Sequence, residues 1–182
     1  MDAETSRRRP SAVPRVELIG ITGIPEIKAG DELASIIVQA AERQGTPIES
    51  GDVLVVTQKI VSKAEGRVVD LKDVSPSSRA QEIARESGRD SRLVELVLRE
   101  SRSIVRMDAA RGVIITETMH GFVCANAGID ASNVPGEDMV TLLPEDPDAS
   151  ARRIGERVQN GRDLNGLAVI VSDTFGRAWR QG

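Results

Sequence analysis

Hydrophobic positions change their spacing along the first third of the chain, and the changes separate the predicted elements. Residues 16–21 (VELIGI) alternate apolar and polar side chains, which predicts a strand. From residue 32 to 44 the apolar side chains fall on one helical face, so we expect a helix with Asp31 as its N-cap. Residues 53–61 (VLVVTQKIV) open with consecutive apolar positions, which favours a strand buried on both faces.

The remaining segments alternate between helical and β-rich patterns. Residues 78–101 predict helix broken near Gly88, with Ser78 and Gln81 spaced as a capping box. SIVRM, GVIITETMH and GFVCANAG follow, and the short polar breaks between them favour a meander or hairpin. VTLLP predicts a short strand, EDPDASARRIGERVQ a helix with Pro147 near its first turn, and LAVIVSD a buried strand. The pattern predicts an α+β protein with a mixed β-sheet and flanking helices.

Length and composition limit the class of protein. The 182 residues can form one domain, which we place at 15–182 after a polar, disordered tail at 1–14. Twenty-eight acidic against 24 basic side chains give a net charge of −4, which argues against nucleic-acid binding. One cysteine excludes an internal disulfide, and no apolar run is long enough to span a bilayer or to form a signal peptide. We therefore expect a cytoplasmic protein without a membrane partner.

Oxygen-bearing side chains follow two of the predicted elements. Asp130, Ser132 and Asn133 lie in AGIDASNVPGED, and Asp173 with Thr174 comes directly after the strand LAVIV. Carboxylate and hydroxyl oxygens are the ligands that Mg²⁺ or Mn²⁺ prefers, so these residues are candidates for a cation site. The alternative is that DASN forms an Asx turn and that Asp173 caps a helix.

Lysine is rare in this chain, and two of the four lysines, Lys59 and Lys63, lie in the single segment TQKIVSKAEGR. A lysine ammonium is suited to neutralising a nucleotide phosphate, and the alternative is a pair of solvated charges at a strand end. Neither G-x-x-x-x-G-K-[ST] nor G-x-G-x-x-G occurs, which disfavours the common nucleotide-binding folds.

Four other reactive side chains carry weaker signals. His120 is the only histidine and fits a structural or tuning role better than that of a catalytic base. Cys124 lies in the apolar run FVCANAG and fits a small buried side chain better than a nucleophile. Arg177 and Arg180 can clamp a carboxylate or phosphate, or be ordinary surface charges.

Four motifs in order, VVTQKIVSKAEGRVV, HGFVCANAGIDASNV, LLPEDPDASA and VIVSDTFGRAWRQG, resemble the coenzyme F420-0:L-glutamate ligase family from about Val16 to Gly182. The resemblance implies the family's α+β fold and a GTP-dependent ligase of F420 biosynthesis. Such an enzyme adds L-glutamate to coenzyme F420-0 through γ-glutamyl amide bonds, by way of an acyl phosphate. It also implies two divalent ions, Mg²⁺ or Mn²⁺, together with K⁺, and a homodimer.

The resemblance assigns binding roles to individual residues but leaves the catalytic residues unassigned. It places a metal ion on Asp130 and Asp173 and a second metal ion on Thr174. Gln58 stands where fused members of the family have a nucleotide-contacting serine. The expected GTP contacts are Ile24, Pro25, Glu26, Ile27, Gln58, Lys63 and Asn133.

The family continues beyond the motif that ends at Gly182, into a segment that supplies a further metal ligand and a nucleotide-binding loop. We therefore expect the natural protein to continue, and the 182-residue chain alone to have ligase activity near background. Two alternatives stay open at this point. One is a non-catalytic module that binds nucleotide or F420, and the other is a metal-dependent amide ligase with a different acceptor.

Overall fold

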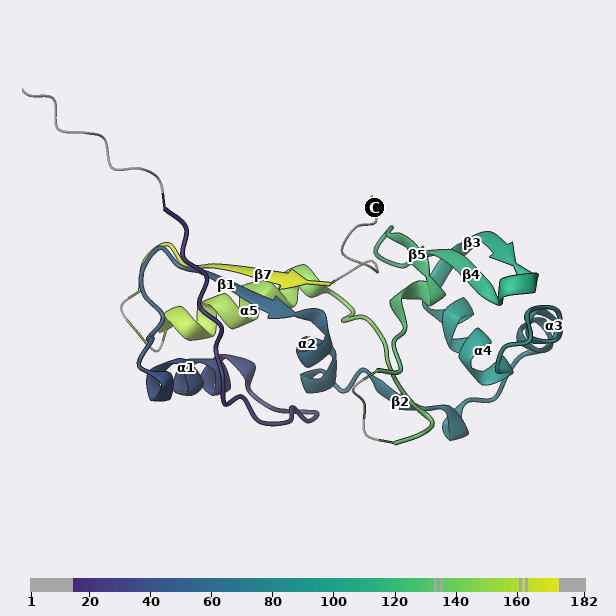
Figure 1. The fold of residues 1–182 in the computed structure, drawn as a ribbon, viewed down its shortest axis with the longest axis horizontal. Helices are drawn as coiled ribbons and strands as arrows, with labels where there is room; N and C mark the ends of the chain where they lie inside the picture. Colours follow the sequence, from purple (N-terminus) through teal and green to yellow (C-terminus); the bar gives the residue numbers. More distant parts are fainter. Residues whose placement is uncertain (1–14, 133, 135, 161, 163, 174–182) are drawn as a thin grey trace, which may run out of the picture.

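The secondary structure of the computed structural model gathers at the two ends of an elongated molecule (Figure 1). The structure describes residues 15–132, 134, 136–160, 162 and 164–173. The first lobe contains α1 (Leu33–Gln44), β1 (Val53–Thr57), α2 (Gln58–Ala64), α5 (Pro147–Asn160) and β7 (Ala168–Ser172). The second lobe contains α3 (Ser78–Ser87), α4 (Ser91–Arg99), β3 (Ser101–Asp108), β4 (Val113–Thr118) and β5 (Val123–Ala125). The predicted tail at 1–14 lies outside the described residues.

A parallel pair of strands, β1 and β7, forms the sheet of the first lobe, with Val53 opposite Ala168 and Thr57 opposite Ser172. One face of the pair packs on α1 and α5 around a core that includes Leu54, Val56, Ile37 and Val158. On the other face Val53, Val55 and Ile170 are 50–58% exposed. The expectation that the strand at the start of residues 53–61 is buried on both faces is therefore wrong for the described part of the chain, whose helices cover only one face of the pair.

The segment 53–61 is not one strand, which corrects a second expectation. The chain leaves the sheet after Thr57 and begins α2 at Gln58, so that Val61 points into the core of the first lobe. Lys59 and Lys63 consequently lie four residues apart on a helix, where side chains at this spacing share one face. Neither lysine is a strand-end charge.

Residues 16–21 do not form a strand, although their pattern alternates. Val16 and Leu18 are 87% and 93% exposed, and no described strand pairs with this segment. The segment is held instead by Gln44 at the end of α1, whose side chain donates to the carbonyl of Gly20 and accepts from the N–H of Thr22. An alternating pattern does not make a segment a strand unless a neighbouring strand pairs with it.

The helix α1 is confirmed, but its N-cap is Glu32 rather than Asp31. The Glu32 carboxylate accepts from the N–H of Ser35 at 2.8 Å, whereas Asp31 accepts from Lys28 in the preceding turn. Gly45 caps the C-terminal end of the helix, and its φ of +80° is the left-handed conformation that glycine adopts without strain.

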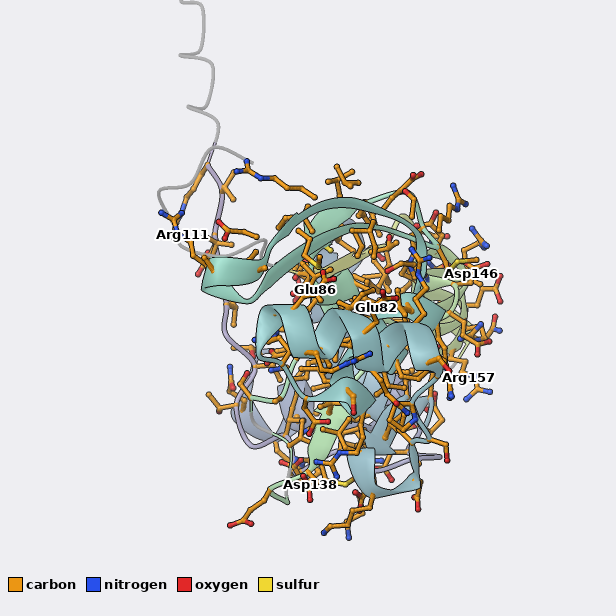
Figure 2. All side chains as sticks on the ribbon, turned by 90° about the vertical axis from the view of Figure 1, so that its right-hand side faces the viewer. Glu82, Glu86, Arg111, Asp138, Asp146 and Arg157 are labelled. Carbon is orange, nitrogen blue, oxygen red and sulfur yellow. The ribbon has the colours of Figure 1, made fainter. Side chains whose placement is uncertain are left out.

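The second lobe confirms the predicted broken helix and the predicted meander. Gly88 ends α3, and β3, β4 and β5 pair antiparallel in that order. The cap of α3 is Ser77, whose Oγ accepts from the N–H of Ala80, so the predicted capping box at Ser78 and Gln81 is wrong by one residue. Figure 2 looks onto this end of the molecule, where the exposed Glu82 and Glu86 lie along α3.

A third sheet, an antiparallel pair, joins β2 (Val68–Asp70) to β6 (Met139–Thr141) between the lobes. The short 3₁₀ helix η1 (Leu71–Asp73) follows β2 and packs through Leu71 against Leu96 of α4 and Val140 of β6. The 3₁₀ helices η2 (Ala109–Arg111) and η3 (Asn126–Gly128) complete the described elements. The α+β class is confirmed, with parallel and antiparallel pairs distributed over three small sheets.

The buried carboxylate of Glu95 ties α4 to the start of α3, and it predicts a pH-dependent stability. Hydrogen bonds from Ser77 Oγ (2.6 Å), the Ser77 N–H (2.9 Å) and Arg99 (2.8 Å) lower the pKa of Glu95 from 4.5 to about 2. Because the folded pKa is the lower one, this stabilisation is complete above pH 4.5 and is lost as the pH falls towards 2. Glu95→Gln should therefore cost about 2 kcal/mol of unfolding free energy at pH 7.

Denaturant unfolding at several pH values measures this effect. The difference between the wild type and Glu95→Gln should shrink as the pH falls below 4.5. The matched control is Glu82→Gln on the exposed side of α3, which should change stability by less than about 0.5 kcal/mol. Equal effects of the two substitutions would contradict the role of Glu95.

Candidate active site

A cavity of about 830 Å³ lies between the two lobes. The first lobe contributes Gln58 and the end of β7, from Val169 to Asp173. The second lobe contributes His120, Phe122, Cys124 and the segment that leads to Asp130. Since β1 and β7 are parallel, the carboxyl ends of both strands lead to this cavity, which is where open parallel sheets place their ligands.

Asp130 is held on the cavity wall by backbone and side-chain contacts. Its backbone forms an isolated antiparallel bridge with Thr141, and the two residues exchange N–H···O bonds of 3.1 and 2.8 Å. Its carboxylate accepts from Lys59 Nζ at 2.7 Å, from Ser132 Oγ at 2.9 Å and from the Ser132 N–H at 2.7 Å. Burial raises the pKa of this carboxyl, but the bonds from Lys59 and Ser132 outweigh burial and leave the pKa below its ordinary value. Asp130 is therefore an anion at neutral pH.

Asp173 follows the last residue of β7 and lines the same cavity as Asp130. Burial, and then the negative charge of Asp173, raise the pKa of the Cys124 thiol. A raised pKa disfavours the thiolate, which agrees with the expectation that Cys124 is not a nucleophile. The structure thus brings the two candidate metal-binding carboxylates, Asp130 and Asp173, to one cavity. The candidates Asn133, Thr174, Arg177 and Arg180 lie outside the described residues.

The donor chemistry around Asp130 fits a hard cation. Three oxygen atoms, Asp130 Oδ2, Ser132 O and Ser132 Oγ, surround the positive charge of Lys59 at 2.7–2.9 Å. The ammonium is a stand-in ion in a shell of oxygens, the ligands that Mg²⁺ and Mn²⁺ prefer. Within the described ranges no three His, Cys, Asp or Glu side chains gather closely enough to bind a metal. A metal ion here would therefore use Asp130 and Asp173 together with hydroxyl, carbonyl or water oxygens.

The candidate nucleotide contacts fall into two places. Lys63 on α2 is 8% exposed, and its Nζ donates to Glu26 Oε1 at 2.6 Å. The loop that contains Glu26 is anchored by buried Ile27 and by a backbone bond from Gly30 to Ala64 at the end of α2. Gln58 instead lines the cavity, and its Oε1 accepts from Ser62 Oγ. The wall of the cavity includes Gln58 but neither Glu26 nor Lys63.

His120 lies on the cavity wall in a structural arrangement. Its Nε2 is 2.8 Å from the carbonyl of Pro144 and 3.1 Å from that of Glu145, so Nε2 carries the proton. The buried Nδ1 finds no hydrogen-bond partner among the described residues, and the ring stacks on Phe122 with centroids 6.2 Å apart. These contacts tie the loop after β4 to the segment that precedes α5.

Sequence reasoning missed the left-handed turn that leads to Asp130. Asn126 and Ala127 have φ values of 52° and 54°, which side chains other than glycine rarely adopt. Gly128 follows with φ 73°, and a Cβ there would lie 2.8 Å from the Leu143 side chain. The segment ANAG contained a partial signal, because Asn and Gly tolerate this conformation, but Ala does not. Strained turns of this kind occur at binding and catalytic sites.

Comparison with known proteins identifies the family. The family model described as F420-0:Gamma-glutamyl ligase matches residues 22–182. The chain is 46% identical to Coenzyme F420:L-glutamate ligase of Methanothermobacter thermautotrophicus, over 92% of this chain and 65% of that protein. It is 45% identical to the protein of that name from Methanopyrus kandleri, over 86% of this chain and 59% of that protein.

A third relative, the Coenzyme F420:L-glutamate ligase of Methanocaldococcus jannaschii, is 39% identical over 92% of this chain and 64% of that protein. The chain thus spans less than two thirds of the length of these three curated relatives. In the part of the chain that the structure describes, no helix is long and apolar enough to cross a membrane. On the family match and these identities, the chain belongs to the F420-0:gamma-glutamyl ligase family.

Proposed function

We propose that the protein containing this chain joins L-glutamate to coenzyme F420-0 through a γ-glutamyl amide bond, with GTP as the activating co-substrate. The family match and the names of its relatives support the ligation and the acceptor. The observation that carries the proposal is the cavity in which the anionic Asp130 is already paired with a cation, the Lys59 ammonium, and which Asp173 also lines.

Amide formation from a carboxylate requires activation. In the proposed reaction a carboxylate oxygen of F420-0 attacks the γ-phosphorus of GTP, and the bond from that phosphorus to the β-bridging oxygen breaks to release GDP. The glutamate amine then attacks the acyl carbon, phosphate leaves with the electron pair of the C–O bond, and the nitrogen loses a proton. Positioning and electrostatics supply most of the rate in such transfers, so neither Cys124 nor a second histidine is needed.

The residues of this chain have separable roles in the proposal. Bound Mg²⁺ or Mn²⁺ would neutralise charge on the phosphate oxygens, and Asp130, Asp173 and Thr174 would hold the two divalent ions. Lys63, buried on α2, would contact the nucleotide phosphates. The cavity volume lies within the range of small-molecule sites, and Phe122 with Val169 and Val171 gives it an apolar wall for the acceptor. A K⁺ ion and a homodimer complete the proposal.

Phosphate release from GTP tests the proposed function. The protein would be expressed from the complete reading frame that encodes this chain and assayed with every combination of F420-0, glutamate and Mn²⁺. We expect phosphate release only when all three are present together with GTP. Tight binding of GTP or F420-0 without turnover would indicate a binding module. Turnover with glutamate that does not require F420-0 would indicate an amide ligase with another acceptor.

A further inference from the structure

The Lys59 ammonium has an unusually complete set of oxygen partners. It donates to Asp130 Oδ2 at 2.7 Å, to Ser132 Oγ at 2.8 Å and to Ser132 O at 2.9 Å. An ammonium has three N–H donors, so these contacts use all of them. The side chain reaches from α2 to a loop 71 residues further along the chain, and it is only 20% exposed.

The same three oxygens cannot serve Lys59 and a metal ion at once. A divalent ion approaches its oxygen ligands to about 2.0–2.6 Å, closer than the ammonium does. An ion bound directly to Asp130 Oδ2 would therefore occupy the position that the ammonium now holds and would repel its positive charge. Lysine is suited to such an exchange because its charge lies at the end of a flexible four-carbon stem.

We propose that Lys59 is an exchangeable internal cation: it keeps the Asp130–Ser132 loop in its binding shape while no divalent ion is bound, and it leaves Asp130 when the ion enters. This inference rests on the proposed metal site. Lys59 is thus a positioning residue, separate from Lys63. Lys63 lies one turn away on the same helix and pairs with Glu26 instead.

Amine labelling followed by peptide mass spectrometry tests the exchange, because this chain has only four lysines. Metal-free protein would be acylated under limiting conditions with and without Mn²⁺. Lys59 should label slowly without the ion and several-fold faster with it. The Lys63 side chain is 9% exposed and the Lys72 side chain 68% exposed, and both should keep their rates and serve as the buried and exposed references.

Two further measurements distinguish a failure of the Lys59 exchange from a failure of the proposed metal site. Asp130→Asn should label rapidly at Lys59 even without Mn²⁺, since the ion-pair partner is gone. Lys59→Met should bind Mn²⁺ several-fold more tightly than the wild type in calorimetry, because no ammonium competes for Asp130. Mn²⁺ that binds while Lys59 labelling and affinity stay unchanged would overturn this inference alone. No binding of Mn²⁺ to the wild type would overturn the inference together with the metal site of the proposed function.

Discussion

Replacing Asp173 with asparagine should lower glutamate ligation to F420-0 by more than about a hundredfold, while the midpoint of thermal unfolding stays nearly unchanged. Asp173 is exposed at the end of β7 and faces the same cavity as Asp130. The substitution preserves the size of the side chain but removes one negative charge from the proposed cation site. Rates measured across a Mn²⁺ titration, together with melting curves, test the expectation.

Asp148 offers a matched control in the same cavity. It is also an exposed aspartate that lines the cavity, but it lies in the first turn of α5 and has no role in the proposed cation site. Asp148→Asn should retain most of the activity and an unchanged Mn²⁺ requirement. If both variants lose activity alike, the effect is the general negative potential of the cavity, and Asp173 is not a specific ligand.

The second large effect is expected at Lys63. Lys63→Met retains the apolar length of the side chain but removes its charge, so GTP affinity should fall by about tenfold to a hundredfold if the ammonium contacts phosphate. Folding should be affected little, because the partner carboxylate of Glu26 is 60% exposed and becomes hydrated when the lysine is removed. Calorimetric titration with GTP measures the affinity directly.

Glu26→Gln distinguishes a phosphate contact from a structural ion pair. In this variant the lysine keeps its charge and loses only the carboxylate at 2.6 Å. GTP affinity should therefore fall far less than in Lys63→Met. Equal losses in the two variants would mean that the ion pair merely holds the loop, and that Lys63 has no direct contact with the nucleotide.

The fold could be predicted where the signal is local. Helical spacing located α1, α4 and α5, and the polar breaks between β-rich stretches located the meander β3–β4–β5. Predictions failed where an element depends on a pairing strand or a covering layer from a distant part of the sequence. Residues 16–21 alternate but have no pairing strand among the described elements. The apolar run of β1 does not reveal that the described helices leave one of its faces open. A strand is stabilised by its neighbours, which its own residues do not encode.

In the candidate site, too, residue types could be predicted from the sequence, but contacts between distant residues could not. The types of residue at Asp130 and Asp173 indicated oxygen ligands, and the structure brings both to one cavity. The contact from Lys59 to Asp130 spans 71 residues, so no spacing rule could find it. The residue pattern does not distinguish Lys59 from Lys63, and the family resemblance assigns the nucleotide contact to Lys63, whereas the lysine that reaches the proposed metal site is Lys59.

Mass spectrometry of the F420 product tests the central claim most directly. F420-0, L-glutamate, GTP and Mn²⁺ would be incubated with the protein expressed from the complete reading frame, and the Asp173→Asn variant would be run in parallel. We predict that F420-0 is converted to species heavier by one or more glutamyl residues, and that the variant leaves it almost unchanged. F420-0 that keeps its original mass, although GTP and Mn²⁺ bind to the protein, would contradict the assignment as a ligase.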